Sequence, residues 1–111
     1  MSETRALCAI LNDHGAVAVG GAAAVAFLDN LVTNSLEGMD EGTARFAALL
    51  NPQGKILFEF VVVRTAEGYL LDVRRDKAAD LVKRLTLYRL RAKVEIQDVS
   101  AQHAVAAVWW L

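Results

Sequence analysis

ARFAALLNPQGKILFEFVVV, residues 44–63, contains two apolar runs separated by the turn sequence Asn-Pro-Gln-Gly at 51–54. Proline holds φ near the value that a β-turn needs at its second position, and glycine allows a positive φ nearby. The two runs are rich in Phe, Leu, Ile and Val, which favour strands. We therefore expect a β-hairpin with well-buried strands.

Glu59 is the only ionisable residue between Lys55 and Arg64 in the second run. Side chains alternate along a strand, so Glu59 is expected to share one face with Val61 and Val63. Beside apolar groups, a carboxylate could accept hydrogen bonds from the N–H edge of a flat heterocycle such as a pterin. The alternative is an acid on the wet side of an antiparallel sheet, and the residues alone favour it.

The chain has 111 residues, the size of one domain, and its net charge of −1 gives no field that would select nucleic acid or an anionic membrane. Its single cysteine, Cys8, excludes an internal disulfide or a multi-cysteine metal site, and we expect this thiol to be buried as a small hydrophobe. The two histidines, His14 and His103, lack an acid or cysteine at metal spacing and are expected in turns. No metal site and no catalytic residue is predicted.

The start of the chain lacks a signal-peptide pattern, and no apolar run reaches the roughly 20 residues needed to cross a bilayer, so the expected location is the cytoplasm, without membrane contact. The hydrophobic fraction of 55% exceeds the roughly 45–50% of typical domains. The sequence also ends on VAAVWWL, residues 105–111. Both features predict the first part of a longer protein, with an exposed apolar surface that could cause self-association.

The rest of the chain reads as alternating strands and helices, with a polar loop between the first helix and the hairpin. This order predicts an α+β fold, with a mainly antiparallel sheet and two helices. The expected elements are a first hairpin formed by 6–11 and 16–19, a helix over 22–33, a polar loop over 34–42, a third strand of the same sheet over 69–73, a helix over 76–87 capped by Asp76, and strands over 92–97 and 104–110.

Basic residues are concentrated in the second half of the chain. Eight of the twelve Lys and Arg residues lie between Asp72 and Glu95. Clustered cations of this kind can bind RNA phosphates, but Tyr88 is the only aromatic residue among them, too few for a stacking platform. The favoured interpretation is a solvated helix face, and an RNA-binding adaptor is the alternative.

Three segments, 27–34, 44–56 and 81–96, resemble the YgfZ-like folate-binding proteins, which are relatives of the glycine-cleavage T-protein, an aminomethyltransferase. The resemblance covers nearly the whole chain in consistent order. It implies that residues 1–111 are the N-terminal portion of the T-protein-like folate-binding fold, with tetrahydrofolate as the cofactor. It also implies support of iron–sulfur cluster assembly or repair, with iron–sulfur proteins or assembly factors as partners and a link to tRNA modification.

The resemblance also implies where folate would bind. Glu59 stands at the second acid of a pair found in the T-protein branch, and Phe58 replaces the first acid. Phe46 and Val63 take the places of T-protein tyrosines near the folate, and Asn34 matches the asparagine of a Thr-Asn-Asp motif. Val61 is expected near Glu59 from strand alternation, and Asn51 from its place at the turn. The predicted folate-binding residues are therefore Asn34, Phe46, Asn51, Glu59, Val61 and Val63.

Two departures from the family pattern limit what the resemblance implies. The loss of the acid pair favours the YgfZ-like branch over the second hypothesis, an aminomethyltransferase fragment. The Lys-Gly-Cys-Tyr-x-Gly-Gln-Glu motif, which YgfZ-like proteins carry in their second half, has no match in these 111 residues. The chain is therefore expected to present part of a folate pocket and to bind folate weakly or not at all by itself.

Overall fold

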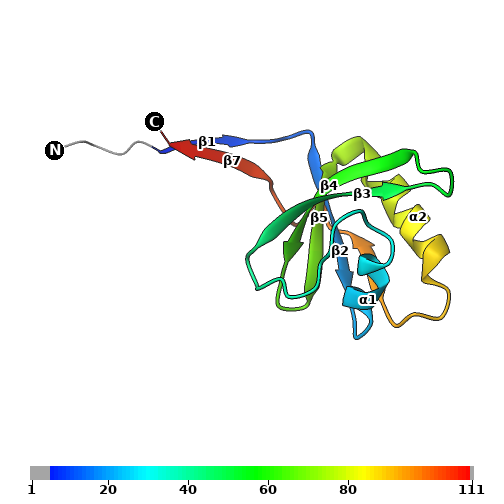
Figure 1. Cartoon of the computed structure of the whole chain (residues 1–111). Helices are drawn as coiled ribbons and strands as arrows, with labels where there is room; N and C mark the ends of the chain where they lie inside the picture. Colours follow the sequence, from blue (N-terminus) through cyan, green and yellow to red (C-terminus); the bar gives the residue numbers. More distant parts are fainter. Residues whose placement is uncertain (1–5, 111) are drawn as a thin grey trace.

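The structure, a computed structural model, describes residues 6–110 and confirms the α+β architecture (Figure 1). A five-stranded sheet has the order β3-β4-β5-β2-β6 with every neighbouring pair antiparallel, and β1 and β7 form a separate two-stranded ribbon. The elements are β1 (Ala6–Ile10), β2 (His14–Gly20), α1 (Ala24–Asp29), β3 (Ala44–Leu50), β4 (Ile56–Arg64), β5 (Gly68–Arg74), the 3₁₀ turn η1 (Arg75–Lys77), α2 (Ala78–Arg89), β6 (Glu95–Asp98) and β7 (Ala106–Trp110).

The predicted hairpin is confirmed as β3 and β4. Their register pairs Ala47 with Phe60 and shifts by one residue near the turn, after Leu49. The Asn51 side chain builds this turn, because its Oδ1 accepts the backbone N–H groups of Gln53 and Lys55, each at 2.9 Å. A side chain that mimics a backbone turn in this way explains why asparagine suits the position.

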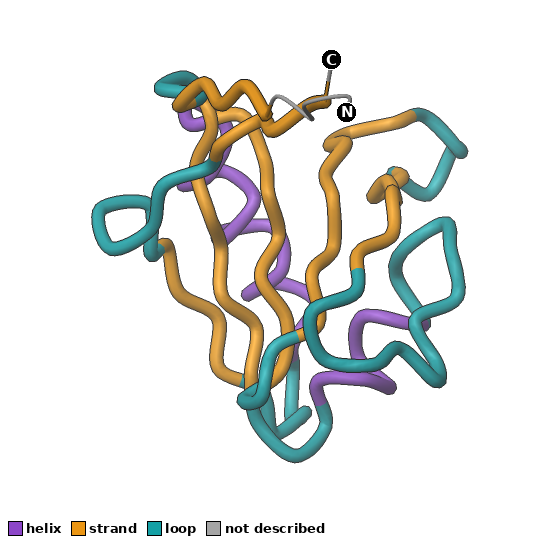
Figure 2. Tube along the Cα trace, turned by 90° about the vertical axis from the view of Figure 1, so that its left-hand side faces the viewer, coloured by secondary structure: helices purple, strands orange, loops and turns teal. Residues whose placement is uncertain are grey.

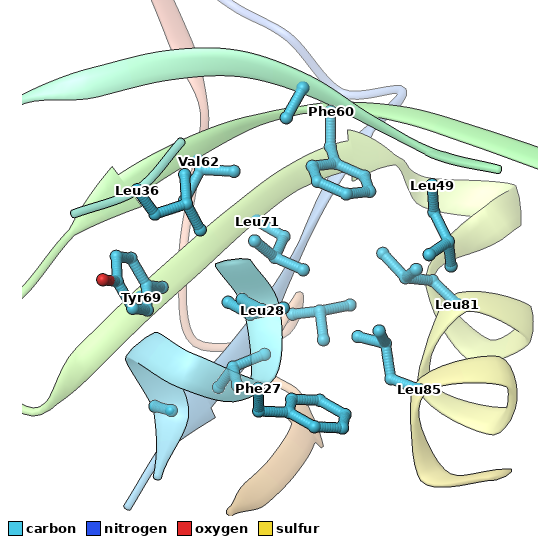
Figure 3. Packing of buried hydrophobic residues seen from close by; sticks show 14 of the residues in the cluster. Phe27, Leu28, Leu36, Leu49, Phe60, Val62, Tyr69, Leu71, Leu81 and Leu85 are labelled. Carbon is cyan, nitrogen blue, oxygen red and sulfur yellow. The ribbon is translucent and has the colours of Figure 1, made fainter. Parts of the chain in front are cut away.

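The core lies between one face of the sheet and the two helices. Figure 3 shows Phe60 from β4 and Leu71 from β5 facing Leu28 of α1 and Leu85 of α2. Leu28, Leu71 and Leu85 are completely buried. All of these side chains belong to one continuous cluster, so both helices cover the same face of the sheet and leave the other face without a helix (Figure 2).

The predicted first hairpin is wrong. A turn does follow β1, but β2 lies inside the sheet, where β5 occupies one of its edges and β6 the other. With both edges of β2 paired, β1 pairs instead with β7, and the ribbon that they form extends away from the sheet (Figure 1). Cys8 lies in this ribbon and is exposed, which corrects the expectation of a buried thiol.

The first helix is shorter than the expected 22–33, because α1 ends at Asp29. The chain then turns to run beside β3. Val32 forms an isolated bridge with Leu49, and Thr33 exchanges two hydrogen bonds with Ala48, from Thr33 N–H to the Ala48 carbonyl and from Ala48 N–H to Thr33 Oγ1, both 3.0 Å. Pairing with the sheet edge therefore overrides helix propensity here.

Two further expectations are corrected by packing and hydrogen bonding. Asp76 does not cap α2: it lies in the 3₁₀ turn before the helix, and its carboxylate is 3.2 Å from Arg74 Nη2.

The 34–42 segment is not a purely polar loop, because Leu36 and Met39 are buried in the core cluster. The Leu36 N–H donates to Asp29 Oδ1 at 2.7 Å, which ties this loop to the end of α1.

Leu90 ends α2 in a conformation that suits glycine. Its φ of 48° and ψ of −112° are those of the first central residue in a type II′ turn, and the turn is closed by Ala92 N–H donating to the Arg89 carbonyl at 2.8 Å. Leu90 is 88% exposed, so no packing offsets this backbone strain. The strained turn is a local feature of the folded state.

Leu90→Gly is expected to raise the free energy of unfolding by about 1 kcal/mol, because glycine adopts this conformation without a Cβ clash. Urea unfolding measures the change. Leu87→Gly is the matched control: Leu87 is also exposed but lies inside α2, where glycine should cost about 1 kcal/mol. The same sign for both variants would contradict a strained turn.

Asp98 closes a turn at the end of β6. Its carboxylate accepts the Ser100 hydroxyl at 2.6 Å and the Ser100 N–H at 3.0 Å, and these hydrogen bonds, helped by the charge of Arg75, hold the pKa of Asp98 below its ordinary value of 3.8. The Ser100 hydroxyl oxygen also accepts the Ala16 N–H at 3.0 Å, which links the turn to β2.

A lowered pKa means that ionised Asp98 stabilises the fold above pH 3.8 and that this contribution disappears as the pH falls through the folded-state pKa. We therefore expect the stability difference between wild type and Asp98→Asn to be larger at about pH 6 than at about pH 3. Urea unfolding at both pH values tests this. An equal difference at the two values would show that the carboxylate's charge is irrelevant to the turn.

Candidate functional site

The face of the sheet without helices, here called the open face, carries most of the predicted ligand-binding residues. The β3–β4 register pairs Phe46 with Val61, Ala48 with Glu59 and Ala44 with Val63. Phe60 and Val62 point into the core, so Glu59, Val61 and Val63 share the opposite face, as predicted from strand alternation.

Exposure differs along this face in a way that matters for binding. Glu59 is exposed, while Val61 and Val63 are half-buried. Phe46 is 60% exposed, although aromatic side chains are usually well covered. The β3–β4 part of this face is therefore an apolar surface with one exposed aromatic ring and one exposed carboxylate.

Asn34 lies beside this surface at the outer edge of β3. Its side-chain Nδ2 donates to the Phe46 carbonyl at 3.2 Å. The segment that carries it is held against β3 by the pairing of Thr33 with Ala48. The structure therefore brings Asn34 next to Phe46, residues that are twelve positions apart in the sequence.

Asn51 is not brought into this group. It lies in the β3–β4 turn, beyond the last register pair of Leu50 with Ile56, and both hydrogen bonds of its Oδ1 are made within the turn. The Asn51 side chain therefore has a structural role in the turn. The other five predicted residues lie on or beside the open face.

Two polar residues on the open face were missed by sequence reasoning. Asp72 of β5 pairs in register with Val61, which makes it a diagonal neighbour of Glu59 on the same face. His14 begins β2 rather than lying in a turn, and its Nδ1 is 2.6 Å from Asp72 Oδ1, a hydrogen bond that the carboxylate accepts. Alternation over 68–74 would have placed Asp72 on this face, but only the strand order brings His14 to it.

A depression of about 330 Å³ lies on the open face beside Val63. Its floor comes from the sheet, with Leu70 and Asp72 of β5, and its wall from the segment 103–106 that leads into β7. The other sheet residues of the depression are apolar, and Asp72 supplies a hydrogen-bond acceptor. Such a site suits a ligand with a flat apolar body and N–H donors at its rim.

Among the described residues 6–110, His, Cys, Asp and Glu form no group of three or more that could hold a metal ion. In the same part of the chain, no helix has both the length and the apolar character needed to cross a membrane. The open face offers a ligand carboxylate acceptors and apolar contact.

Comparisons with known proteins agree with the fold. The protein named iron-sulfur cluster assembly factor IBA57 homolog, mitochondrial, of Mycosarcoma maydis is 29% identical over 109 residues, which cover 86% of this chain and 27% of that protein. The aminomethyltransferase of Thermotoga neapolitana is 31% identical over 96 residues, which cover 84% of this chain and 26% of that protein. The chain thus spans about a quarter of the length of these relatives.

The crystal structure of the glycine cleavage system aminomethyltransferase T from Bartonella henselae superposes with a TM-score of 0.80 at 21% identity, over 93% of this chain and 28% of that one. This likeness shows the fold alone. The sequence profile of the GCVT N-terminal domain matches residues 5–109, nearly the entire chain. The chain therefore belongs to the GCVT N-terminal domain family.

Proposed function

We propose that the open face is part of a tetrahydrofolate-binding site in a YgfZ-like protein that supports iron–sulfur cluster assembly or repair, with residues 1–111 as its folate-binding N-terminal domain. The observation that carries the proposal is the exposed Glu59 carboxylate on an apolar face beside Phe46 and Val61. The naming of the fungal relative as an iron–sulfur cluster assembly factor supports the wider role.

The residues of the open face fit one end of a folate. A pterin ring is flat and carries N–H groups along one edge, which match the acceptors of Glu59 and Asp72 on neighbouring strands. Phe46, Val61 and Val63 provide the apolar surface on which such a ring could lie, and Phe46 has the largest exposed area to lose. When bound, tetrahydrofolate supplies a carrier for one-carbon groups; the residues of this chain bind and orient it.

The replacement of the first acid by Phe58 favours a binding role for this site over a catalytic one. It occupies the place of the first acid in the T-protein pair, and in the structure it is partly buried against the core cluster. Neighbouring residues of a strand point to opposite faces, so only Glu59 of the two faces the open side. One carboxylate without a second acid beside it in the chain suits a hydrogen-bond acceptor for the ligand.

An aminomethyltransferase is the second candidate, because the Thermotoga neapolitana relative carries that name. It requires catalysis in addition to binding. Folate-dependent glycine cleavage by a protein carrying this domain, lost in Glu59→Gln, would favour it over the first candidate. The cytoplasmic location, the link to tRNA modification and self-association stay predictions.

Glu59→Gln is expected to weaken tetrahydrofolate binding about tenfold or more, because a hydrogen bond to a charged acceptor is worth about 1.5–3 kcal/mol. Titration of tetrahydrofolate into the ¹⁵N-labelled chain, followed by NMR, measures weak affinities and locates the site. Amide shifts should concentrate at Phe46, Glu59, Val61 and Val63. Glu41→Gln removes the same charge from an exposed loop and should leave the affinity unchanged.

Two outcomes would contradict the proposal. Shifts that spread over the helix side of the sheet, rather than the open face, would place the ligand elsewhere. Equal affinities of wild type and Glu59→Gln would remove the role of this carboxylate, even if folate bound to the open face.

A further inference from the structure

A second surface, on the helix side of the sheet, carries an unbalanced positive charge. From Lys83 to Lys93 the chain has five cations and no acid, since the nearest carboxylates in sequence are Asp80 and Glu95. Among the ion pairs closer than 4 Å in the described part of the chain, none involves any of these five cations. Their charges are therefore available to a partner.

A groove of about 350 Å³ runs beside two of these cations. It lies between α1 and the turn at the end of α2. Just before α1, Ala23 N–H donates to the carbonyl of Lys93, the residue after the turn, at 3.2 Å. Figure 1 shows the segment that contains this turn, running from the end of α2 to β6. The groove lining is mostly apolar, with Phe27, Leu31, Tyr88 and Leu90, and it includes Arg89 and Arg91.

Leu90 is the residue that links strain with exposure at this groove. Its side chain is 88% exposed and its backbone adopts the positive φ of a II′ turn, where glycine would cost less. The strained backbone of Leu90 lowers the stability of the fold, and its exposed apolar side chain adds no burial that would offset the strain, so neither is explained by folding. Strain of this kind is found where the exposed group serves binding.

We propose that this groove binds an acidic amphipathic helical segment of a partner protein. The apolar lining would take the leucine-type side chains of such a helix, and Arg89 and Arg91 would pair with its carboxylates. RNA fits less well, because its phosphates gain nothing from the apolar lining, and of the two aromatic rings in that lining Phe27 is almost fully buried, which leaves Tyr88 alone to stack with a base. The surface lies opposite the open face, so the proposal does not depend on folate binding.

The test uses a synthetic peptide of about 16 residues with leucines at i, i+3, i+4 and i+7 and glutamates elsewhere. Added to the ¹⁵N-labelled chain, it should shift amides of α1 and of residues 88–92. Arg91→Glu and Leu90→Gly should each weaken binding about tenfold. Leu90→Gly is informative because the turn strain predicts a more stable fold, so lost binding could not be ascribed to unfolding.

Controls separate the groove from general electrostatics. Lys55→Glu makes a comparable charge reversal at the β3–β4 turn and should change the affinity by less than about threefold. A peptide with the same leucines and lysines in place of glutamates should not bind. No shifts at residues 88–92 would overturn the proposal, as would preferential binding of an RNA oligonucleotide or of anionic phosphatidylserine vesicles to the same residues.

Discussion

Gly68→Ala is expected to destabilise the domain by roughly 2–5 kcal/mol, a large share of the stability of a domain this size. Gly68 begins β5 with φ +154°, and a Cβ at this position would lie 2.2 Å from the Val19 carbonyl oxygen and 2.9 Å from the Gly20 Cα. Both contacts are with backbone atoms of the paired strand β2, which cannot move aside as a flexible side chain can. The clash therefore falls on the pairing of β5 with β2, at the point where β5 begins and β2 ends.

Gly38→Ala provides the matched control for Gly68→Ala. Gly38 has φ +72°, so alanine there is strained, but no atom lies within 4 Å of the added Cβ. Only the strain of about 1–2 kcal/mol should remain. Chemical denaturation of both variants measures the difference. A Gly68→Ala variant as stable as Gly38→Ala would show that the β2–β5 pair relaxes to accept a methyl group.

Leu85→Ala is expected to cost roughly 2–5 kcal/mol, because it leaves a cavity where a completely buried side chain of α2 packs. Leu87, two residues further along the same helix, is 69% exposed, and Leu87→Ala should change stability by less than about 0.5 kcal/mol. Helix propensity changes equally in the two variants. The comparison therefore isolates packing, and equal losses would contradict the assignment of Leu85 to the core.

Local signals allowed part of the fold to be predicted. The hairpin of β3 and β4 follows from one turn and two apolar runs that are adjacent in sequence. The pairing of β1 could not be predicted, because it depends on which edges of β2 are filled by β5 and β6, strands more than 45 residues away. The burial of Leu36 and Met39 could not be predicted for a similar reason: a segment rich in acids and glycines can still turn two apolar side chains into the core.

In the candidate site too, local sequence predicts some neighbours, and the order of distant strands determines the others. Alternation along one strand placed Glu59, Val61 and Val63 together, and the structure confirms that arrangement. Asp72 and His14 come from strands that neighbour β4 only through the sheet order β4-β5-β2, which pattern alone does not specify. The roles of Glu59 and Asp72 in folate binding stay predictions, which the titration of tetrahydrofolate tests.

The ribbon of β1 and β7 has a consequence for how the chain folds. It pairs Ala6 with Trp110, so it closes a loop of roughly 100 residues, whereas β3 and β4 meet across a turn of a few residues. Closing so long a loop is entropically costly until the sheet has already brought the two ends together. The ribbon should therefore form last in refolding, after the sheet to which it is attached. Its pairing should begin at its base, where the Leu11 N–H donates a hydrogen bond to the Val105 carbonyl.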